Sequence, residues 1–169
     1  MKLLEIGCGS AFYIRHAATR NPLLSAVGVE LQPAVAEIAR LNISQWNLQD
    51  RVTIVAGDIR DQHFDAPFTI ATLHNNIYYF PVEERVALLG HVRQCIEPGG
   101  FLLVTTCCQG GNPGMQALNL WGAATAGAGR LPAADEMIAQ LKDAGFRDVE
   151  ASRLIPGDAY FSFKADRGG

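Results

Sequence analysis

Short apolar runs alternate with longer amphipathic stretches along the first two thirds of the chain. The runs that we expect to be strands cover residues 2–7, 24–30, 51–56, 67–73 and 101–106. The expected helices are 11–20, 33–48 and a segment after Pro81, in which Val82, Val86, Leu89, Val92 and Ile96 form one apolar face. Strands that alternate with helices in this way predict an α/β domain with a largely parallel sheet.

The last third of the chain has a different pattern. Residues 109–130 are rich in glycine and predict loop and helix of low intrinsic stability. A helix is expected after Pro132, followed by strands at 147–154 and 159–165. Only Ile155-Pro156-Gly157-Asp158 separates these strands, and a connection this short predicts an antiparallel hairpin. Dinucleotide-binding domains continue with parallel crossovers instead.

Composition narrows the class of protein. The chain has 169 residues, 49% of apolar type and 18% charged, which predicts one folded domain. It contains no apolar run long enough for a membrane span and no signal peptide in residues 1–20, so we expect a cytoplasmic protein. The net charge of −3 and the absence of a basic tract argue against a nucleic-acid partner. The cysteines lack zinc-site spacing, so no metal is expected.

Two glycines follow the first strand, in Glu5-Ile6-Gly7-Cys8-Gly9. Glycine permits a tight turn there and lets the backbone approach a ligand. Glu30 ends the next strand, where a carboxylate can accept hydrogen bonds from both hydroxyls of a ribose. Domains that bind NAD share this pair. They place a third glycine where this chain has Phe12, so a pyrophosphate ligand is disfavoured.

The third strand ends in Gly57-Asp58-Ile59. A carboxylate beside an aliphatic side chain suits an adenine ring, with Asp58 on the exocyclic amine and Ile59 against the ring face. The alternative is an aspartate that begins a turn. Glu5, Glu30 and Asp58 lie at or near the ends of three consecutive strands, which meet at the edge where open α/β sheets bind ligands.

The motifs E-I-G-C-G, V-E-L, G-D-I, P-G-G and L-K-D-A-G-F follow one another in the order of a known family. The chain resembles class I S-adenosylmethionine-dependent methyltransferases, and in pattern the small-molecule O-methyltransferases. The resemblance implies a Rossmann-like seven-stranded mixed sheet of order 3-2-1-4-5-7-6, with strand 7 antiparallel and helices on both faces. It also implies that Gly7 and Gly9 pass under the methionine part of S-adenosyl-L-methionine, and that Glu5 orients the glycine turn.

The same resemblance assigns the ribose to Glu30 and the adenine to Asp58 and Ile59. The candidate cofactor-binding residues are Glu5, Gly7, Cys8, Gly9, Glu30, Leu31, Asp58, Ile59, His74 and Asn75. Many members of the family have a third glycine at the position of Ala11, so we expect a slightly tightened turn here. The N-terminal helices that usually cover the cofactor are absent from residues 1–169. We therefore expect either a fragment of a longer protein or a homodimer whose partner closes the site.

Candidate catalytic residues follow the fourth strand. His74 matches the histidine of the family's L-H-D-W motif and can act as a base for a hydroxyl substrate. Asn75 replaces the aspartate of that motif, and the alternative for His74 is a cofactor contact. Tyr78 is the second candidate, from an aromatic run that suits the wall of a flat substrate but is also typical of a core. The run resembles the N-P-P-Y motif only faintly, because both prolines are missing.

The sequence is compatible with three functions. The first is methyl transfer from S-adenosylmethionine to a small molecule, with oxygen ahead of carbon or nitrogen as acceptor. The second is a catalytically silent domain that binds the same cofactor in a regulatory role. The third is an NAD-dependent enzyme, which Phe12 and the terminal hairpin oppose. Trp121 and Met115 lie in the glycine-rich stretch and are candidates for a lid over the substrate.

Overall fold

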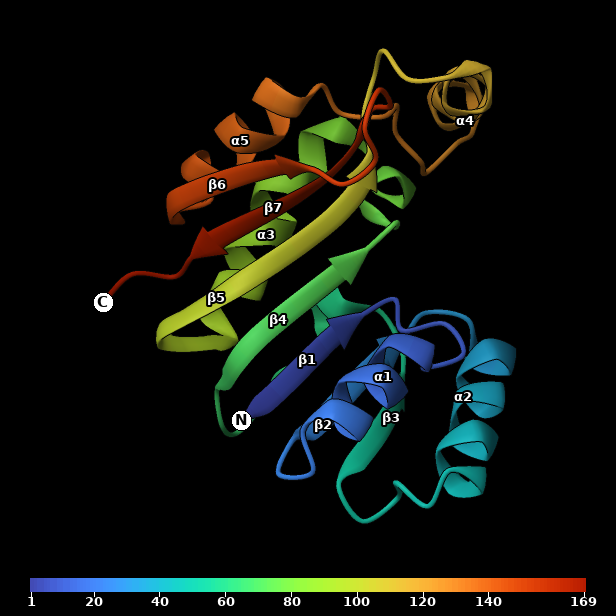
Figure 1. Ribbon diagram of the computed structural model, residues 1–169, viewed down its shortest axis with the longest axis vertical. Coiled ribbons are helices and arrows are strands. Elements are labelled where there is room, and N and C mark those ends of the chain that lie inside the picture. Colours follow the sequence, from blue (N-terminus) through green and yellow to red (C-terminus); the bar gives the residue numbers. More distant parts are fainter.

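The computed structural model describes residues 1–169, which form one seven-stranded sheet. Figure 1 shows that this sheet is twisted and covered by helices. The strands are β1 (Lys2–Ile6), β2 (Ser25–Glu30), β3 (Val52–Ala56), β4 (Phe68–His74), β5 (Ile96–Cys107), β6 (Arg147–Arg153) and β7 (Tyr160–Asp166). Their order is β3-β2-β1-β4-β5-β7-β6, and β7 is antiparallel to both of its neighbours. The predicted fold class and the terminal hairpin are confirmed.

Five α-helices and three short 3-10 helices connect the strands. The α-helices are α1 (Phe12–Arg20), α2 (Pro33–Gln45), α3 (Arg85–Gln94), α4 (Pro113–Ala124) and α5 (Ala134–Asp143). The 3-10 helices are η1 (Ile59–Asp61), η2 (Ile77–Tyr79) and η3 (Val82–Glu84). None of the helices combines the length and the apolar character needed to cross a bilayer.

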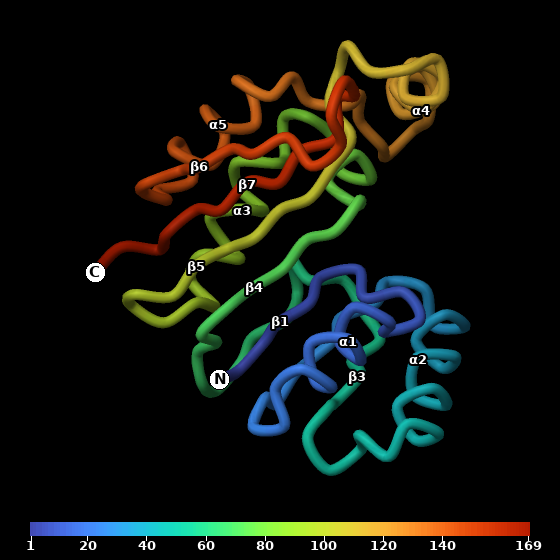
Figure 2. The backbone as a smooth tube through the Cα atoms, viewed as in Figure 1, coloured from blue at the N-terminus to red at the C-terminus, as the bar shows by residue number.

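The sheet separates two apolar cores because successive side chains of a strand point to opposite faces. In β1, Leu3 belongs to the core under α1 and α2, whereas Leu4 and Ile6 belong to the core under α3 and α5. Figure 1 shows α1 in front of the sheet and α3 behind it. Figure 2 traces how α4 lies beyond the end of β5, outside both layers. Glu5 shares the α1 face with Leu3.

The expected helix after Pro81 differs from the observed one in its start, its end and its buried face. A 3-10 turn precedes α3, and Ile96 belongs to β5 instead of the helix. The buried residues of α3 are Arg85, Leu88, Leu89 and Val92, so an arginine takes a position that the apolar pattern assigned to Val86. Strand β5 also starts earlier than residue 101, because Ile96 already pairs with Phe68, ahead of a register shift that precedes the pair of Ile70 and Phe101.

Two other element boundaries move for local reasons. Helix α1 begins at Phe12 and not at residue 11, because Ala11 has a left-handed backbone with φ 66°. Helix α2 ends at Gln45, three residues short of the expected 48. Within the glycine-rich stretch, the Asn112 side chain accepts a hydrogen bond from the Met115 amide at 3.1 Å and caps α4.

Candidate functional site

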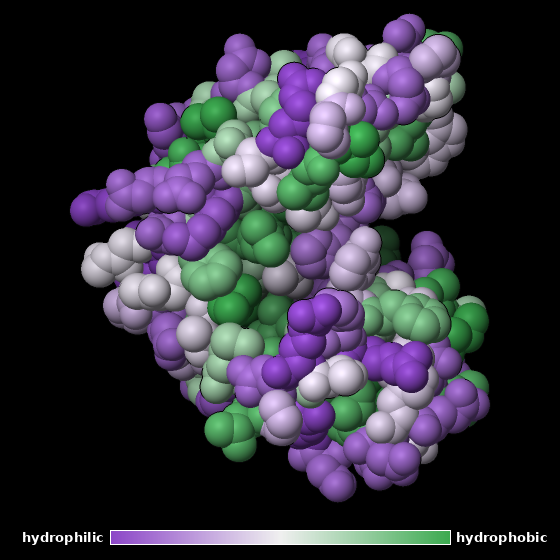
Figure 3. All heavy atoms as spheres, viewed as in Figure 1, coloured by the Kyte–Doolittle hydropathy of each residue, from purple (hydrophilic) through white to green (hydrophobic).

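A cavity of about 590 Å³ opens where β1, β2, β3 and β4 end, which is the predicted edge of the sheet. Figure 3 shows the surface hollowed between the half that carries α4 and the half that carries α1 and α2. Eight of the predicted residues line this cavity: Gly7, Gly9, Glu30, Leu31, Asp58, Ile59, His74 and Asn75. We call Gly7, Gly9, Glu30, Leu31, Asp58 and Ile59 the cofactor ledge.

The opposite side of the cavity comes from later parts of the chain. Tyr79, Phe80, Trp121 and residues 125–128 line it, and we call this set the outer wall. The rings of Tyr79 and Trp121 meet edge to face with centroids 5.8 Å apart. Trp121 therefore lies at the cavity, as the lid prediction expects, whereas Met115 does not line it.

The glycine turn depends on backbone conformations that favour glycine. Gly7 and Gly9 have φ values of 63° and 54°. A Cβ at Gly7 would overlap the side-chain amide of Asn76, which donates a hydrogen bond to the Ile6 carbonyl. Asn76 is buried, and its hydrogen bond to Ile6 supports the glycine turn from the interior of the protein. This role of Asn76 was not predicted from the sequence, because the contact joins residues that are 70 positions apart.

The Glu30 carboxylate joins two loops of the ledge. One oxygen accepts from the Gly9 amide at 2.9 Å, and the other accepts from the Gln32 amide at 3.0 Å. A carboxylate has about four acceptor positions, so each oxygen retains capacity for a further hydroxyl donor. Glu30 can hold a ribose diol without giving up these loop contacts.

Asp58 begins a turn and also lines the cavity, so the two sequence interpretations are compatible. Its carboxylate accepts from the Arg60 amide at 2.9 Å and from the Arg60 guanidinium, which holds the pKa of Asp58 below its usual range. The same guanidinium pairs with Glu84 at 2.6 Å and lies over the Phe80 ring. Arg60 was not predicted, and it connects the ledge to the outer wall.

Glu5 and Cys8 lie behind the ledge and do not line the cavity. Glu5 is 1% exposed, and burial raises its pKa to about 8. One of its carboxylate oxygens has no hydrogen-bond partner. The Cys8 thiol packs toward Gly28 in the core under α1, and burial raises its pKa to about 12. Cys8 thus contributes its backbone to the turn and its side chain to the core.

His74 is held on two sides at the end of β4. Its Nδ1 is 2.8 Å from the Thr105 hydroxyl, and its ring lies 4.4 Å from the Tyr13 ring between centroids. Burial lowers the pKa of His74, which favours the neutral imidazole. Because Thr105 occupies Nδ1, Nε2 is the nitrogen left for another partner.

The residues after His74 divide between the cavity and the core. Asn75 lines the cavity and has a left-handed backbone. Its side-chain amide donates a hydrogen bond to the Tyr160 hydroxyl at 2.9 Å. Tyr78 is only 8% exposed and lies outside the cavity lining, and burial raises its pKa to about 12. Tyr79 is 55% exposed and lines the cavity. The geometry therefore favours Tyr79 over Tyr78 as the aromatic residue that meets a ligand.

The residues of the ledge fit S-adenosylmethionine in chemical type. Glu30 has free acceptor capacity for two hydroxyls, the glycine turn has no side chains to obstruct an amino-acid moiety, and Leu31 and Ile59 offer apolar surface to a flat ring. Phe12 projects from the start of α1 and packs against Trp46, with ring centroids 5.1 Å apart. It occupies the position where a pyrophosphate-binding turn needs glycine.

Known proteins resemble this chain in sequence and in fold. Residues 3–100 match a family model described as a methyltransferase domain. Demethylspheroidene O-methyltransferase of Cereibacter sphaeroides is 24% identical over 159 residues, which cover 92% of this chain and 41% of that protein. Human N-acetylserotonin methyltransferase, solved with S-adenosylmethionine, has a TM-score of 0.82 at 18% identity and covers 99% of this chain and 48% of its own.

A third similar protein is an O-methyltransferase of neocarzinostatin biosynthesis, solved with S-adenosylhomocysteine and 1,4-dihydroxy-2-naphthoic acid. Its TM-score is 0.82 at 21% identity, over 98% of this chain and 49% of that one. The chain thus spans about half the length of the solved relatives and less of the curated one. The family model covers more than half of the present sequence. The chain therefore belongs to the methyltransferase-domain family, with the class I fold that uses S-adenosylmethionine as its cofactor.

Proposed function

We propose that residues 1–169 form the cofactor-binding domain of a methyltransferase that acts on a hydroxyl group of a small molecule. The observation that carries this proposal is His74, a neutral imidazole at the cavity with Nδ1 held by Thr105. Two relatives named above are O-methyltransferases, and one was solved with an aromatic diol. The exposed ring of Tyr79 is suited to pack against such a flat acceptor.

In this proposal each side chain has a defined task. When bound, the cofactor supplies an activated methyl group on a sulfonium. Glu30 binds the ribose hydroxyls, Asp58 and Ile59 bind the adenine, and the Gly7–Gly9 turn accommodates the methionine part. His74 Nε2 accepts the proton of the acceptor hydroxyl as the oxygen becomes a nucleophile, a contribution that is typically worth about 10²- to 10⁴-fold in rate.

A methyl-transfer assay with a panel of phenols and hydroxynaphthoic acids tests the proposal. The wild-type chain should methylate at least one hydroxyl acceptor. His74→Gln should lower kcat about 10²-fold or more and leave S-adenosylhomocysteine affinity within about twofold, because only proton transfer is lost. His91→Gln is the matched control, since His91 bonds the Gln62 carbonyl away from this cavity.

The direction of the pH profile is a second readout of the same role. A protonated imidazole cannot accept a proton, so kcat/KM should fall as the pH falls through the lowered pKa of His74. Equal loss of cofactor affinity and kcat in His74→Gln would make His74 a cofactor contact instead of a base. Tight binding of S-adenosylhomocysteine with no transfer to any acceptor would identify a silent binding domain.

A further inference from the structure

The outer wall is built from two segments that are far apart in the sequence. Residues 77–80 follow β4, whereas Trp121 and residues 125–128 belong to the end of α4 and to its connection with α5, which covers residues 125–133. The Gly129 amide donates to the Tyr78 carbonyl at 2.9 Å, which ties the segments together at one point. The position of Tyr79 relative to residues 125–128, and so the shape of this side of the cavity, depends on how these segments are held.

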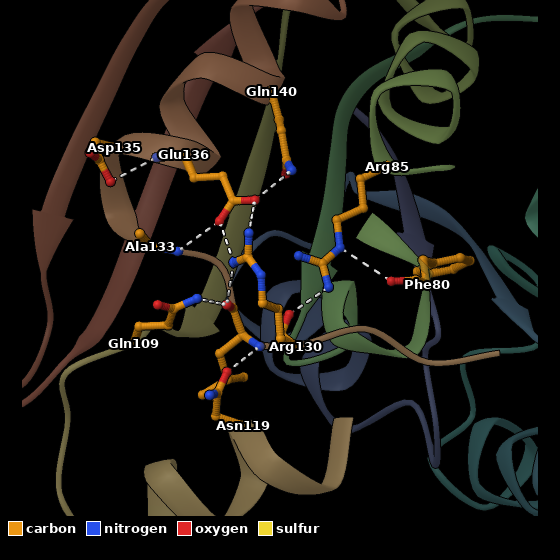
Figure 4. Close-up of polar contacts among 10 residues, drawn as sticks. Phe80, Arg85, Gln109, Asn119, Arg130, Ala133, Asp135, Glu136 and Gln140 are labelled. Carbon is orange, nitrogen blue, oxygen red and sulfur yellow. Dashed lines mark hydrogen bonds and ion pairs between the residues drawn. The ribbon is translucent and has the colours of Figure 1, made fainter. Parts of the chain in front are cut away.

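Arg85 provides the other two ties. Its side chain is fully buried at the start of α3. Nε donates to the Phe80 carbonyl at 3.2 Å, and Nη2 donates to the Arg130 carbonyl at 2.7 Å. Figure 4 shows the guanidinium between these two carbonyls. One planar group therefore sets the separation of the two wall segments.

Gly129 is adapted to this guanidinium. A Cβ at residue 129 would stand 2.6 Å from Arg85 Nη2 and 2.6 Å from the Phe80 carbonyl oxygen. No side chain fits there unless Arg85 or the Phe80 segment moves. Gly129 thus leaves free the space in which the Arg85 guanidinium packs.

Stability alone does not account for an arginine at this position. Arg85 Nη1 has no hydrogen-bond partner, and a buried unpaired N–H costs about 1–3 kcal/mol. The nearby carboxylate of Glu136 is bound by Arg130 at 2.6 and 2.9 Å, as Figure 4 shows. Apolar side chains often replace buried ionic groups without loss of stability. What a guanidinium offers here is simultaneous contact with two carbonyls.

We propose that Arg85 is a positioning residue for the acceptor substrate. It holds the Phe80 and Arg130 carbonyls at a fixed separation and thereby shapes the outer wall against which the acceptor packs. This role rests on the proposed methyl transfer to a small molecule. None of the hydrogen bonds of Arg85 reaches the cofactor ledge, so the proposal concerns acceptor binding and not cofactor binding.

The test compares Arg85→Met, Arg85→Lys and Gly129→Ala with the control Arg51→Met. Arg51 also donates to backbone carbonyls, those of Ala18, Asn21 and Leu24, but it does not line the cavity. Arg85→Met and Gly129→Ala should raise the acceptor KM about tenfold or more, because small displacements of a binding wall have large kinetic effects. The dissociation constant of S-adenosylhomocysteine should stay within about twofold. Arg85→Lys can keep at most one of the two hydrogen bonds, so its acceptor KM should lie between that of the wild type and that of Arg85→Met.

A readout without catalysis accompanies the kinetics. The chain has two tryptophans, so Trp46→Phe leaves Trp121 of the outer wall as the sole tryptophan, whose emission can be excited selectively over that of the tyrosines. In this background, the Arg85 variants and Gly129→Ala should make Trp121 more accessible to acrylamide, and Arg51→Met should not. This measurement supports or overturns the role of Arg85 even if no acceptor is methylated, a result that would count against the proposed function alone.

Two results would overturn the proposal. One is a loss of S-adenosylhomocysteine affinity that parallels the rise in acceptor KM, which would place Arg85 in general support of the fold or of the ledge. The other is Trp121 quenching that does not differ between the Arg85 variants and Arg51→Met. If Arg85→Met does not fold, Arg85→Lys and Gly129→Ala carry the same comparison, since both retain a polar or small group at the altered position.

Discussion

A buried ionisable side chain lies behind each side of the cavity, and at pH 7 one of the two is neutral whereas the other is charged. Glu5 lies behind the cofactor ledge, where burial raises its pKa to about 8 and favours the neutral acid at pH 7. Arg85 lies behind the outer wall, where burial lowers its pKa only to about 10, so it stays cationic. A neutral acid thus lies behind the ledge, and a cation that holds two backbone carbonyls lies behind the wall.

The same contrast extends to what each side is made of. The ledge consists of turns at the ends of three strands, where backbone conformation sets the shape, as in Gly7 to Gly9. The wall consists of two segments that are joined by one backbone hydrogen bond and by the two hydrogen bonds of the Arg85 side chain. We therefore expect the ledge to be sensitive to backbone conformation, and the wall to be sensitive to the loss of a single guanidinium.

Gly7→Ala should cause the largest effect on the ledge. The left-handed backbone costs a residue with a Cβ about 1–2 kcal/mol, and overlap with the buried Asn76 amide adds about 1–3 kcal/mol. Gly9→Ala is the matched control, because Gly9 has a similar φ but nothing within 4 Å of its Cβ position. Urea unfolding should show a clearly larger loss for Gly7→Ala. Equal losses would mean that conformation alone limits the turn.

These differences also explain how much the sequence alone predicts. Gly7, Glu30 and Asp58 were predicted because a strand end and a short spacing place each of them at one edge of the sheet. Asn76 and Arg85 could not be found in this way, because Asn76 bonds a carbonyl 70 residues away and Arg85 bridges to a carbonyl 45 residues away. An arginine in the buried face of α3 also contradicts the apolar pattern by which a helix face is recognised.

On the acceptor side of the cavity, too, the sequence predicts some residues but not the contacts that define their roles. His74 was predicted from its place at the end of the fourth strand and its match to the L-H-D-W motif, but Thr105, which holds its Nδ1, comes from the neighbouring strand and carries no sequence signal. The choice between Tyr78 and Tyr79 depends on the η2 turn, which directs one ring into the core and the other toward the cavity. Local pattern cannot distinguish two adjacent tyrosines.

Glu5→Gln tests, through the pH dependence of stability, whether Glu5 is neutral in the folded chain. The folded-state pKa of Glu5 is raised from 4.5 to about 8, so the folded chain binds a proton that the unfolded chain releases. The free energy of unfolding of the wild type should therefore fall as the pH rises from about 5 to 8, by up to a few kcal/mol. Glutamine resembles the protonated acid and should remove most of this slope.

The control for Glu5 is Glu37→Gln, which removes an exposed carboxylate that pairs only with Arg40. This variant should keep the pH slope of the wild type, because an exposed pair contributes little. Urea unfolding at several pH values between 5 and 8 measures both variants. A slope in Glu5→Gln equal to that of the wild type would show that Glu5 does not hold its proton in the folded chain.

Glu30→Gln tests the proposed contact between ledge and ribose. An amide keeps the shape but loses acceptor capacity, so S-adenosylhomocysteine should bind about 1–3 kcal/mol more weakly, or about 5- to 150-fold. Calorimetry measures this change, with Glu37→Gln again as the control. Arg85→Lys should leave the same affinity unchanged. Unchanged affinity in Glu30→Gln would remove the ribose assignment and leave Glu30 as a loop contact between Gly9 and Gln32.

Ala11→Gly has the smallest expected effect and is sensitive to backbone strain in the ledge. Replacing Ala11 by glycine removes the conformational cost of a left-handed alanine, about 1–2 kcal/mol. The same change destabilises the fold by about 0.5–1 kcal/mol, because glycine loses more entropy on folding, and by about 0.8 kcal/mol for the lost buried methyl. These terms nearly cancel. Ala18→Gly, at a fully buried position in the interior of α1, has the same costs and no relief. Urea unfolding should therefore find Ala11→Gly milder than Ala18→Gly by about 1 kcal/mol or more, whereas equal destabilisation would mean that Ala11 is not strained.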